Sequence, residues 1–250
     1  MQKYGTLFAR VYNERWAGFA NQVAPLIRAL YEDTLQRSDR TLLDLCCGTG
    51  QMAAHFLEAG YQVVGLDLSA DMLHHAQSNA AAYVESGQAR FVQGDAADFH
   101  LEESFGLIVS TFDALNHLPD ADALRGCFAS VRRALKADGV FIFDLNTRRG
   151  LNRWNTITVS EDDDLALINR GIYDGGERAY TRISGFVRDD KSGQYDRFAE
   201  TFYNVAYSLA DVQGWLKDAG FADLTIAASS DLSAPADDPE ALGRAWFVAR

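Results

Sequence analysis

The first 150 residues alternate between short apolar runs and stretches in which apolar residues recur at helical spacing. The apolar runs lie at residues 41–46, 62–66, 90–93, 107–110 and 140–145. Nearly continuous apolar runs of this length are typical of parallel strands that are buried on both faces of a sheet. The pattern therefore predicts an α/β fold in which a mostly parallel sheet carries helices on both faces.

Small polar residues and glycines mark the ends of several predicted helices. Ser69 and Ser208 stand immediately before helical patterns, where a hydroxyl can cap the first turn. Gly60 and Gly220 follow the last residues of two other patterns, as expected for glycine at a helix C-terminus. These signals predict helices at residues 51–59, from about residue 70, and from residue 209.

Residues 151–207 break the alternation of strands and helices. Turn signals at residues 174–176 and 189–193 separate β-rich runs. We expect three antiparallel strands, near residues 165–173, 177–188 and 194–206. The chain then divides into an N-terminal helical segment, a core and an inserted antiparallel β-lobe over the substrate site. These three parts comprise residues 1–40, residues 41–150 with 208–250, and residues 151–207.

Composition and charge narrow the classes of partner. The chain has 250 residues, with 48% apolar and 23% charged residues, which is ordinary for a globular protein. The net charge of −12 disfavours a nucleic-acid substrate, because an acidic surface repels a phosphate backbone. Arg148, Arg149 and Arg153 form the densest basic group, and we interpret them as solvated loop charges. A small-molecule substrate is the better expectation, with the chain acting as a monomer or homodimer.

The cysteines and the N-terminus suggest a cytoplasmic protein. Cys46 and Cys47 are adjacent, and Cys127 is far away in the sequence, so neither metal-ligand spacing nor an ordinary disulfide is expected. The N-terminus lacks the apolar segment of a signal peptide, and we find no apolar run long enough for a membrane span. The expected location is therefore the cytoplasm, with no membrane partner.

A glycine-rich turn follows the first apolar run. Gly48 and Gly50 permit a sharp turn and a close approach of the backbone to a ligand. The helix that begins near Gln51 would offer unpaired N–H groups to that ligand. Asp67 ends the second apolar run, at the spacing typical of a carboxylate that binds two ribose hydroxyls. Together these features predict a nucleotide-binding site.

Two motifs resemble those of the class I S-adenosylmethionine-dependent methyltransferases. The first is Leu43-Asp44-Leu45-Cys46-Cys47-Gly48-Thr49-Gly50, and the second is Gly65-Leu66-Asp67-Leu68-Ser69-x-x-Met72-Leu73. The resemblance extends over nearly the whole chain. It implies a Rossmann-like, seven-stranded sheet with one antiparallel strand, closed by strands at residues 223–227 and 245–249. It also implies S-adenosylmethionine as cofactor, S-adenosylhomocysteine as product, and no metal.

The resemblance further implies which residues contact the cofactor. Asp95 would lie by the adenine amino group and Met72 on or beside the ring, although a Gly-Asp pair is also a common turn and Met72 could be core. Tyr12 and Trp16, at helical spacing with Phe8, would fold over the methionine end as a lid, or would face the core. The full cofactor set is Tyr12, Trp16, Asp44, Cys46, Gly48, Thr49, Gly50, Asp67, Leu68, Met72, Gly94, Asp95, Ala96 and Thr111.

The loop after the fourth predicted strand is where an acceptor should meet the cofactor's methyl group, because ligands bind beyond the carboxyl ends of parallel strands. His117 is the candidate general base, since a histidine accepts a proton near neutral pH; alternatively it only orients the loop. Asp113 and Asn116 are candidates for binding polar groups of the substrate or for capping the loop. In the lobe, Tyr173, Tyr203 and Phe202 either line the acceptor pocket or belong to the core.

We expect methyl transfer by direct in-line displacement to nitrogen or oxygen of a small polar metabolite. The chain is similar to small-molecule methyltransferases with an inserted β-lobe, some of which methylate amino groups of nucleotide-linked sugars. Two alternatives remain at this point. Gly48-x-Gly50-x-x-Ala53 with Asp67 would also satisfy a loose dinucleotide motif of an NAD(P)-dependent oxidoreductase. A non-catalytic protein that binds S-adenosylmethionine would share the same motifs.

Overall fold

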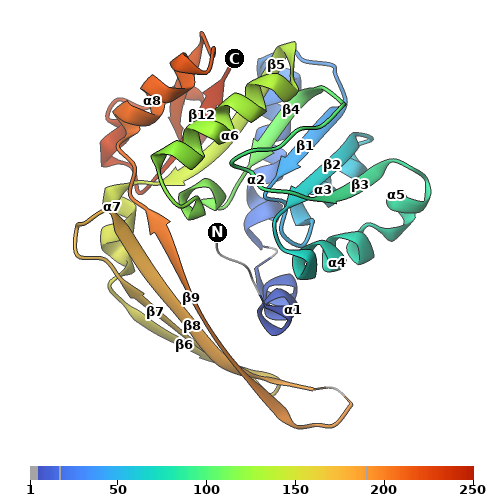
Figure 1. The fold of residues 1–250 in the computed structure, drawn as a ribbon, viewed down its shortest axis with the longest axis vertical. Helices are drawn as coiled ribbons and strands as arrows, with labels where there is room; N and C mark the ends of the chain where they lie inside the picture. Colours follow the sequence, from blue (N-terminus) through green and yellow to red (C-terminus); the bar gives the residue numbers. More distant parts are fainter. Residues whose placement is uncertain (1–4, 17, 190) are drawn as a thin grey trace.

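The computed structural model describes residues 5–16, 18–189 and 191–250. Two sheets organise this part of the chain (Figure 1). Sheet A is the eight-stranded core sheet, and sheet B is a four-stranded antiparallel sheet that extends away from one end of it. This arrangement confirms the predicted α/β core with an inserted antiparallel lobe.

Sheet A has the strand order β11-β10-β12-β5-β4-β1-β2-β3. The strands β1 to β5 are parallel, whereas β12 is antiparallel to both β5 and β10. The direction of winding reverses between β1 and β4, which is where an open parallel sheet binds its ligand. The bounds are β1 Thr41–Leu45, β2 Gln62–Asp67, β3 Ala89–Gln93, β4 Phe105–Ser110, β5 Leu135–Asn146, β10 Leu224–Ala228, β11 Asp231–Pro235 and β12 Arg244–Ala249.

The count of seven strands was wrong, because β11 adds an eighth at the edge. This strand pairs antiparallel with β10 through an irregular register. Leu232 is its one buried residue, and the others are exposed. An edge strand that buries so little carries no alternating pattern, so its sequence resembles that of a loop.

The helices cover both faces of sheet A. Ser69 and Ser208 cap α4 and α8 by accepting hydrogen bonds from Met72 N and Asp211 N, as predicted. The helical bounds are α1 Thr6–Arg15, α2 Gly18–Ala29, the π-helix η1 Leu30–Thr34, α3 Gln51–Glu58, α4 Ala70–Asn79, α5 Ala81–Glu85, the 3-10 helix η2 Ala114–His117, α6 Ala121–Ala134, α7 Arg148–Leu151, the 3-10 helix η3 Asn152–Trp154, α8 Leu209–Asp218 and the 3-10 helix η4 Pro239–Ala241.

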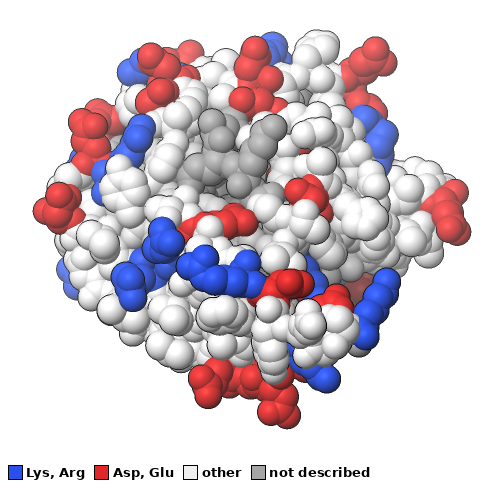
Figure 2. All heavy atoms as spheres, turned by 60° about the horizontal axis from the view of Figure 1, so that its bottom comes forward, with Lys and Arg blue, Asp and Glu red and all other residues white. Residues whose placement is uncertain are grey.

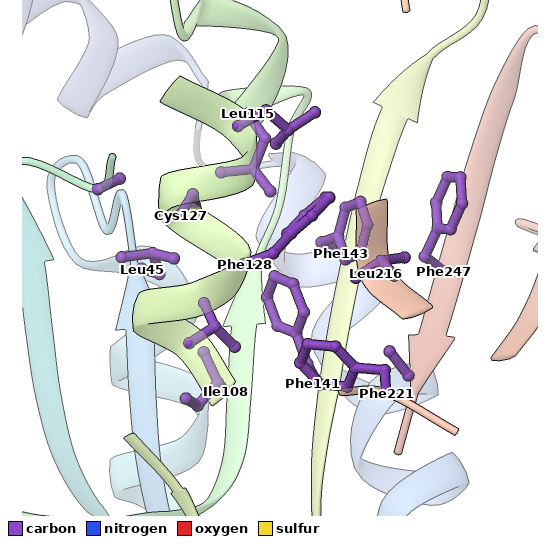
Figure 3. Close-up of a cluster of buried hydrophobic side chains, with 14 of the residues drawn as sticks. Leu45, Ile108, Leu115, Cys127, Phe128, Phe141, Phe143, Leu216, Phe221 and Phe247 are labelled. Atoms are coloured by element: carbon purple, nitrogen blue, oxygen red, sulfur yellow. The ribbon is translucent and has the colours of Figure 1, made fainter. Parts of the chain in front are cut away.

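Each face of sheet A packs its own core. Alternate residues of β5 divide between them: Phe141 and Phe143 face α6 and α8, whereas Ile142 faces α2 and α3. Figure 3 shows the first core, in which Phe143 stacks on Phe247 with ring centroids 4.7 Å apart. A fully buried side chain of this size contributes about 1.5–3 kcal/mol to folding. This packing holds the strand ends, and with them the loops of the site, in place.

Sheet B has four strands where three were expected. Its strands are β6 Ile157–Glu161, β7 Leu165–Ile172, β8 Arg178–Arg188 and β9 Tyr195–Val205, in that spatial order. The additional strand is β6, an edge strand in which every residue is exposed. Ile157 and Val159 alternate with Thr158 and Ser160, as in a strand, but the run is short and both apolar side chains are exposed, and it was not among the expected strands.

The first helix joins the two sheets. Phe8 of α1 packs on Phe202 of β9, with ring centroids 4.9 Å apart, and both belong to one cluster with Met72 of α4. Leu165, Ile183, Val187 and Phe198 of sheet B complete this cluster. The inner face of sheet B is therefore anchored to the core through α1.

Charge is unevenly distributed over the surface. Figure 2 shows basic side chains in a band across the middle of the face at the bottom of Figure 1, with acidic side chains mostly at its outline.

In the part of the chain that the structure describes, no helix combines the length and the apolar character that crossing a membrane requires.

Candidate functional site

A cavity of about 410 Å³ lies beyond the carboxyl ends of β1 and β4, where the strand order reverses. Its lining comes from both sheets. We call the part formed by the loops after β1, β2 and β3 the glycine-loop end, and the part formed by sheet B, η3 and β12 the lobe end. The loop after β4, residues 111–117, runs between the two ends.

The glycine-loop end is shaped by backbone conformation. Cys46, Gly48 and Gly50 have φ of 62°, 54° and 81°, in the left-handed region. At Gly50 a side chain would also meet Ala76, since an added Cβ would lie 3.0 Å from the Ala76 Cβ. The turn thus depends on glycine here for two reasons, conformation and its close approach to α4.

Asp67 holds the glycine turn from the neighbouring strand. Its Oδ2 accepts a hydrogen bond from Gly48 N at 2.8 Å, and its Oδ1 accepts one from Ser69 N at 2.9 Å. Burial raises the pKa of this carboxyl group, while backbone hydrogen bonds from Ser69, Gly48 and Leu68 oppose that rise. Each oxygen keeps a further lone pair, and Asp67 lines the cavity. The side chain is therefore suited to accept hydrogen bonds from two ligand hydroxyls.

Twelve of the residues predicted for the site line this one cavity. They come from six separate segments that the fold brings together. These residues are Tyr12, Trp16, Cys46, Gly48, Asp67, Leu68, Met72, Gly94, Ala96, Thr111, Asp113 and His117.

Four residues predicted to bind the cofactor are not among the residues that line the cavity, and they stabilise the loops that do. Asp44 accepts a hydrogen bond from Ala53 N at 3.1 Å, at the first turn of α3, and burial raises the pKa of its carboxyl group to about 7. Asp95 accepts one from Ala97 N at 2.8 Å and so closes its own turn. Thr49 and Gly50 are fully covered within the loop.

Three predicted substrate residues are also outside the described lining, and their contacts explain why. The Asn116 amide donates to Asn146 O and Val205 O, which ties η2 to two strands. Tyr173 donates its hydroxyl to Gly176 O, in a separate small core. Tyr203 lies under the Arg178 guanidinium, 4.5 Å from its ring centroid, on the opposite face of β9 from Phe202. The contacts described for these three residues are structural, and their contact with a substrate stays a prediction.

The aromatic residues of α1 contribute to the core and to the cavity together. Phe8 is buried against Phe202, whereas Tyr12 and Trp16 remain partly accessible at the cavity, with ring centroids 5.7 Å apart. Burial, followed by the negative charges of Asp113 and Asp67, raises the pKa of the Tyr12 hydroxyl, which therefore stays protonated. We call these three residues the aromatic lid.

The loop after β4 has a strained turn. Phe112 and Asp113 have φ of 65° and 50°, although neither is glycine. The buried carboxylate of Asp144 accepts hydrogen bonds from both of their backbone N–H groups, at 2.7 and 2.9 Å. Arg244 forms ion pairs with Asp144 and with Asp113, the latter at 2.7 Å. This arrangement carries the chain into η2 and hence to His117.

His117 stands at the junction of the two ends of the cavity. Its Nε2 is 3.8 Å from Asp113 Oδ2 and 3.3 Å from the Asn204 amide nitrogen. The Asn204 oxygen accepts from the Asn146 amide, so its NH₂ group faces the histidine. Burial lowers the pKa of His117, while the Asp113 charge opposes this shift. A neutral imidazole that can accept a proton is the result.

The lobe end contains residues that sequence reasoning missed. Alternate residues of β7 and β8 share the inner face of sheet B, but the alternation alone does not say which face meets a cavity. Arg244 had no local signal, because its partners Asp144 and Asp113 are 100 and 131 positions away in the chain. Over the whole cavity, the missed lining residues are Leu66, Phe112, Ala114, Leu118, Asn146, Arg153, Trp154, Thr156, Asn169, Gly171, Thr181, Ile183 and Arg244.

The described residues contain no group of three or more histidine, cysteine or acidic side chains arranged to hold a metal ion. The three cysteines are free, and burial raises the pKa of each thiol. The chemistry available in the cavity therefore comes from Asp67, Asp113, His117, the two arginines and the aromatic lid.

Comparison with known proteins gives consistent results. A family model described as a methyltransferase domain matches residues 42–139. A protein of Geobacillus sp. (strain WCH70), provisionally named as a methyltransferase, is 30% identical over 215 residues. These residues cover 84% of this chain and 84% of that protein. The dTDP-3-amino-3,4,6-trideoxy-alpha-D-glucopyranose N,N-dimethyltransferase of Streptomyces venezuelae is 32% identical over 129 residues, 52% of this chain and 50% of that enzyme.

A solved structure shares the whole fold. The crystal structure of an S-adenosylmethionine-dependent methyltransferase from Clostridium acetobutylicum ATCC 824 has a TM-score of 0.80 with this chain, at 24% identity. The match covers 98% of this chain and 97% of that one, so it includes sheet B as well as sheet A.

Proposed function

Because this chain belongs to the class I S-adenosylmethionine-dependent methyltransferases, we propose that it methylates nitrogen or oxygen of a small polar metabolite by direct in-line displacement. The family membership sets aside the nicotinamide-dependent alternative. The single observation that carries the proposal is the shared cavity, in which Asp67 and the glycine turn face His117 and sheet B.

The glycine-loop end fits an adenosyl group. The Asp67 carboxylate provides acceptors for two ribose hydroxyls, and Leu68, Met72 and Ala96 supply apolar surface for a flat ring. Gly48 and Thr111 line the adjoining stretch towards the lobe, with Tyr12 and Trp16 over it. In this proposal Asp44, Thr49, Gly50 and Asp95 shape the loops without direct contact. When bound, S-adenosylmethionine supplies a methyl group already activated on a sulfonium sulfur.

The protein's part in the reaction is alignment, exclusion of water and removal of a proton. The aromatic lid lines the cavity, and in this proposal it limits access of water to the reacting atoms. The acceptor would lie between His117 and the inner face of sheet B, held in line with the methyl group. The neutral His117 imidazole accepts the proton that the acceptor nitrogen or oxygen loses, and no protein side chain is methylated.

A polar acceptor is supported by the lobe end of the cavity. Asn169, Thr181 and Thr156 present amide and hydroxyl groups, and Arg153 and Arg244 contribute cationic groups. The Streptomyces venezuelae relative is named for an amino-sugar substrate, which is compatible with a polar acceptor. The proposal covers either nitrogen or oxygen as the atom that is methylated.

Binding and turnover test the proposal separately. Calorimetric titration should show binding of S-adenosylmethionine and S-adenosylhomocysteine, and no comparable binding of NADH. Incubation with S-adenosylmethionine and a fractionated metabolite extract should then release S-adenosylhomocysteine in the fractions that contain the acceptor. Binding without any release across all fractions would contradict an enzymatic role, and tight binding of NADH alone would contradict the cofactor.

A further inference from the structure

Arg244, the first residue of β12, bridges two buried carboxylates in the wall of the cavity. It forms an ion pair with Asp113 Oδ1 at 2.7 Å and a second, shorter one with Asp144. The Asp144 side chain is fully buried, and that of Asp113 is 10% exposed. Two buried acids that share one guanidinium leave a net negative charge, so the loss of the cation would leave both acids uncompensated.

The same bridge supports the strained turn after β4. Two successive non-glycine residues in left-handed conformation are strained, and they persist only where the surroundings enforce them. Asp144 does so by accepting the N–H groups of Phe112 and Asp113. Arg244 in turn fixes the orientation of the Asp144 carboxylate. The position of η2, which starts at the next residue, therefore depends on this arginine.

Aromatic rings close the other side of the guanidinium. Its carbon lies 5.0 Å from the centroid of the Phe19 ring and 5.8 Å from that of Phe112, and these two rings stack 4.6 Å apart. Arg244 thereby connects α2, the loop after β4, β5 and β12. A planar guanidinium can stack on rings and bridge two carboxylates together, which an ammonium group cannot reproduce.

The bridge ends at the candidate base. Asp113 directs Oδ1 to Arg244 and Oδ2 towards His117 Nε2, at 3.8 Å. We propose that Arg244 is a positioning residue for methyl transfer, which sets the place of His117 through the 112–113 turn and offsets the charge of Asp113 beside it. This inference rests on the proposed function of the same cavity.

The charged and polar groups around His117 predict how its pKa depends on Arg244. Asp113 faces His117 from the same loop, and Asn204 and the backbone of Tyr203 face it from β9. Asp144 on β5 and Arg244 on β12 lie behind Asp113. The Tyr12 hydroxyl of α1 is in the field of the same acids and stays neutral. When Arg244 is neutralised, the guanidinium no longer offsets the charge of Asp113 beside the imidazole. The pKa of His117 then rises.

The test compares Arg244→Gln and Arg244→Lys with Arg90→Gln, an exchange at an exposed ion pair with Glu103 outside the described lining. We expect kcat to fall by roughly 10²-fold in Arg244→Gln, because the base is misplaced. In Arg244→Lys we expect a fall of about tenfold. The acid limb of the kcat profile should move to higher pH in Arg244→Gln, whereas a purely structural loss would lower the rate equally at every pH.

Two further measurements keep the inference falsifiable. The Cε1–H resonance of His117, assigned by its absence in His117→Gln, should titrate at higher pH in Arg244→Gln than in the wild type. If Arg244→Gln does not fold, Arg244→Ala with added guanidinium should regain activity that sodium at equal ionic strength does not restore. An unchanged His117 titration together with a kcat within twofold of wild type would overturn the inference, and so would failure of guanidinium rescue.

Failure of this inference can be distinguished from failure of the proposed function. The histidine titration needs no methyl acceptor, so it reports on the bridge even if no substrate is found. Absence of S-adenosylmethionine binding by the wild type would instead refute the proposed function, while leaving the titration result intact.

Discussion

The two ends of the cavity are built in different ways. The glycine-loop end consists of turns that directly follow β1, β2 and β3, and its shape comes largely from backbone conformation and one carboxylate. The lobe end consists of residues from η3, three strands of sheet B and β12. In the proposed function the first end binds the cofactor and the second the acceptor, so the cofactor site would depend on local turns and the acceptor site on how a separate sheet is docked.

Helix α1 docks sheet B onto the core. The contact depends on α1, which packs Phe8 against Phe202 on one side and presents Tyr12 and Trp16 to the cavity on the other. A change in the lobe that lies away from α1 should therefore alter the proposed recognition of the acceptor without altering the proposed cofactor end. Four substitutions test this division, from the largest expected effect to the smallest.

Asp67→Ala should affect the glycine-loop end most severely. We expect the dissociation constant for S-adenosylmethionine to rise at least about 100-fold, because two hydrogen bonds to a charged acceptor, together worth roughly 3 kcal/mol, are lost. Isothermal titration calorimetry measures this change. Asp122→Ala, which removes an acid with an 88% exposed side chain, is the matched control and should bind normally. Near-normal affinity in Asp67→Ala would refute the cofactor placement.

His117→Ala should slow turnover by about 10²-fold and leave the affinity for cofactor unchanged, because the residue acts on the acceptor. In the wild type, burial lowers the pKa of His117, so the neutral base persists below pH 6.5 and activity should extend into mildly acidic solution. The initial rate as a function of pH measures both effects. His100→Ala, an exchange at an exposed histidine, serves as control. An unchanged rate would assign His117 to the scaffold.

Gly171→Ala should disturb the lobe end alone. An added Cβ would lie 2.0 Å from the carbonyl oxygen of Trp154, so β7 and η3 must separate. We expect KM for the acceptor to rise about tenfold, while calorimetry shows the same affinity for S-adenosylmethionine. The control is Gly214→Ala in α8, where an added Cβ meets no described atom within 4 Å. Equal damage to cofactor binding would show that the two ends are not independent.

Asp44→Asn should have the smallest effect on activity, and its main consequence should be a pH-dependent stability. The pKa of Asp44 is about 7 in the folded protein and about 3.9 in an unfolded chain. The folded state therefore binds the proton more tightly, and the wild type loses stability as pH rises between these values. Asparagine cannot ionise, and its oxygen can still accept from Ala53 N.

Melting temperatures measured from pH 4 to pH 8 test this prediction. The difference between Asp44→Asn and wild type should increase with pH and reach roughly 5 °C in favour of the variant at pH 8. A constant difference across this range would mean that Asp44 does not titrate there. Loss of cofactor affinity in the variant would show that Asp44 contacts the cofactor after all.

Local pattern was sufficient for most of the core and for the glycine-loop end. The apolar runs, the caps at Ser69 and Ser208 and the turn at Gly48 each depend on neighbouring residues, so the sequence displays them directly. Asp67 was identifiable because a strand end and a glycine turn stand at a regular spacing in this fold. The edge strands β6 and β11 escaped notice because they bury little.

By itself, then, the sequence determined the α/β core, the glycine turn with its acid, and the class of cofactor. The tertiary structure decided which face of sheet B meets the cavity, so that Phe202 faces inward while Tyr203 lies outside it. It also decided that Arg244 joins Asp113 across 131 positions of the chain. Hydrophobic periodicity reports burial within one element, whereas the docking of two sheets and the pairing of distant charges arise only when the chain is folded.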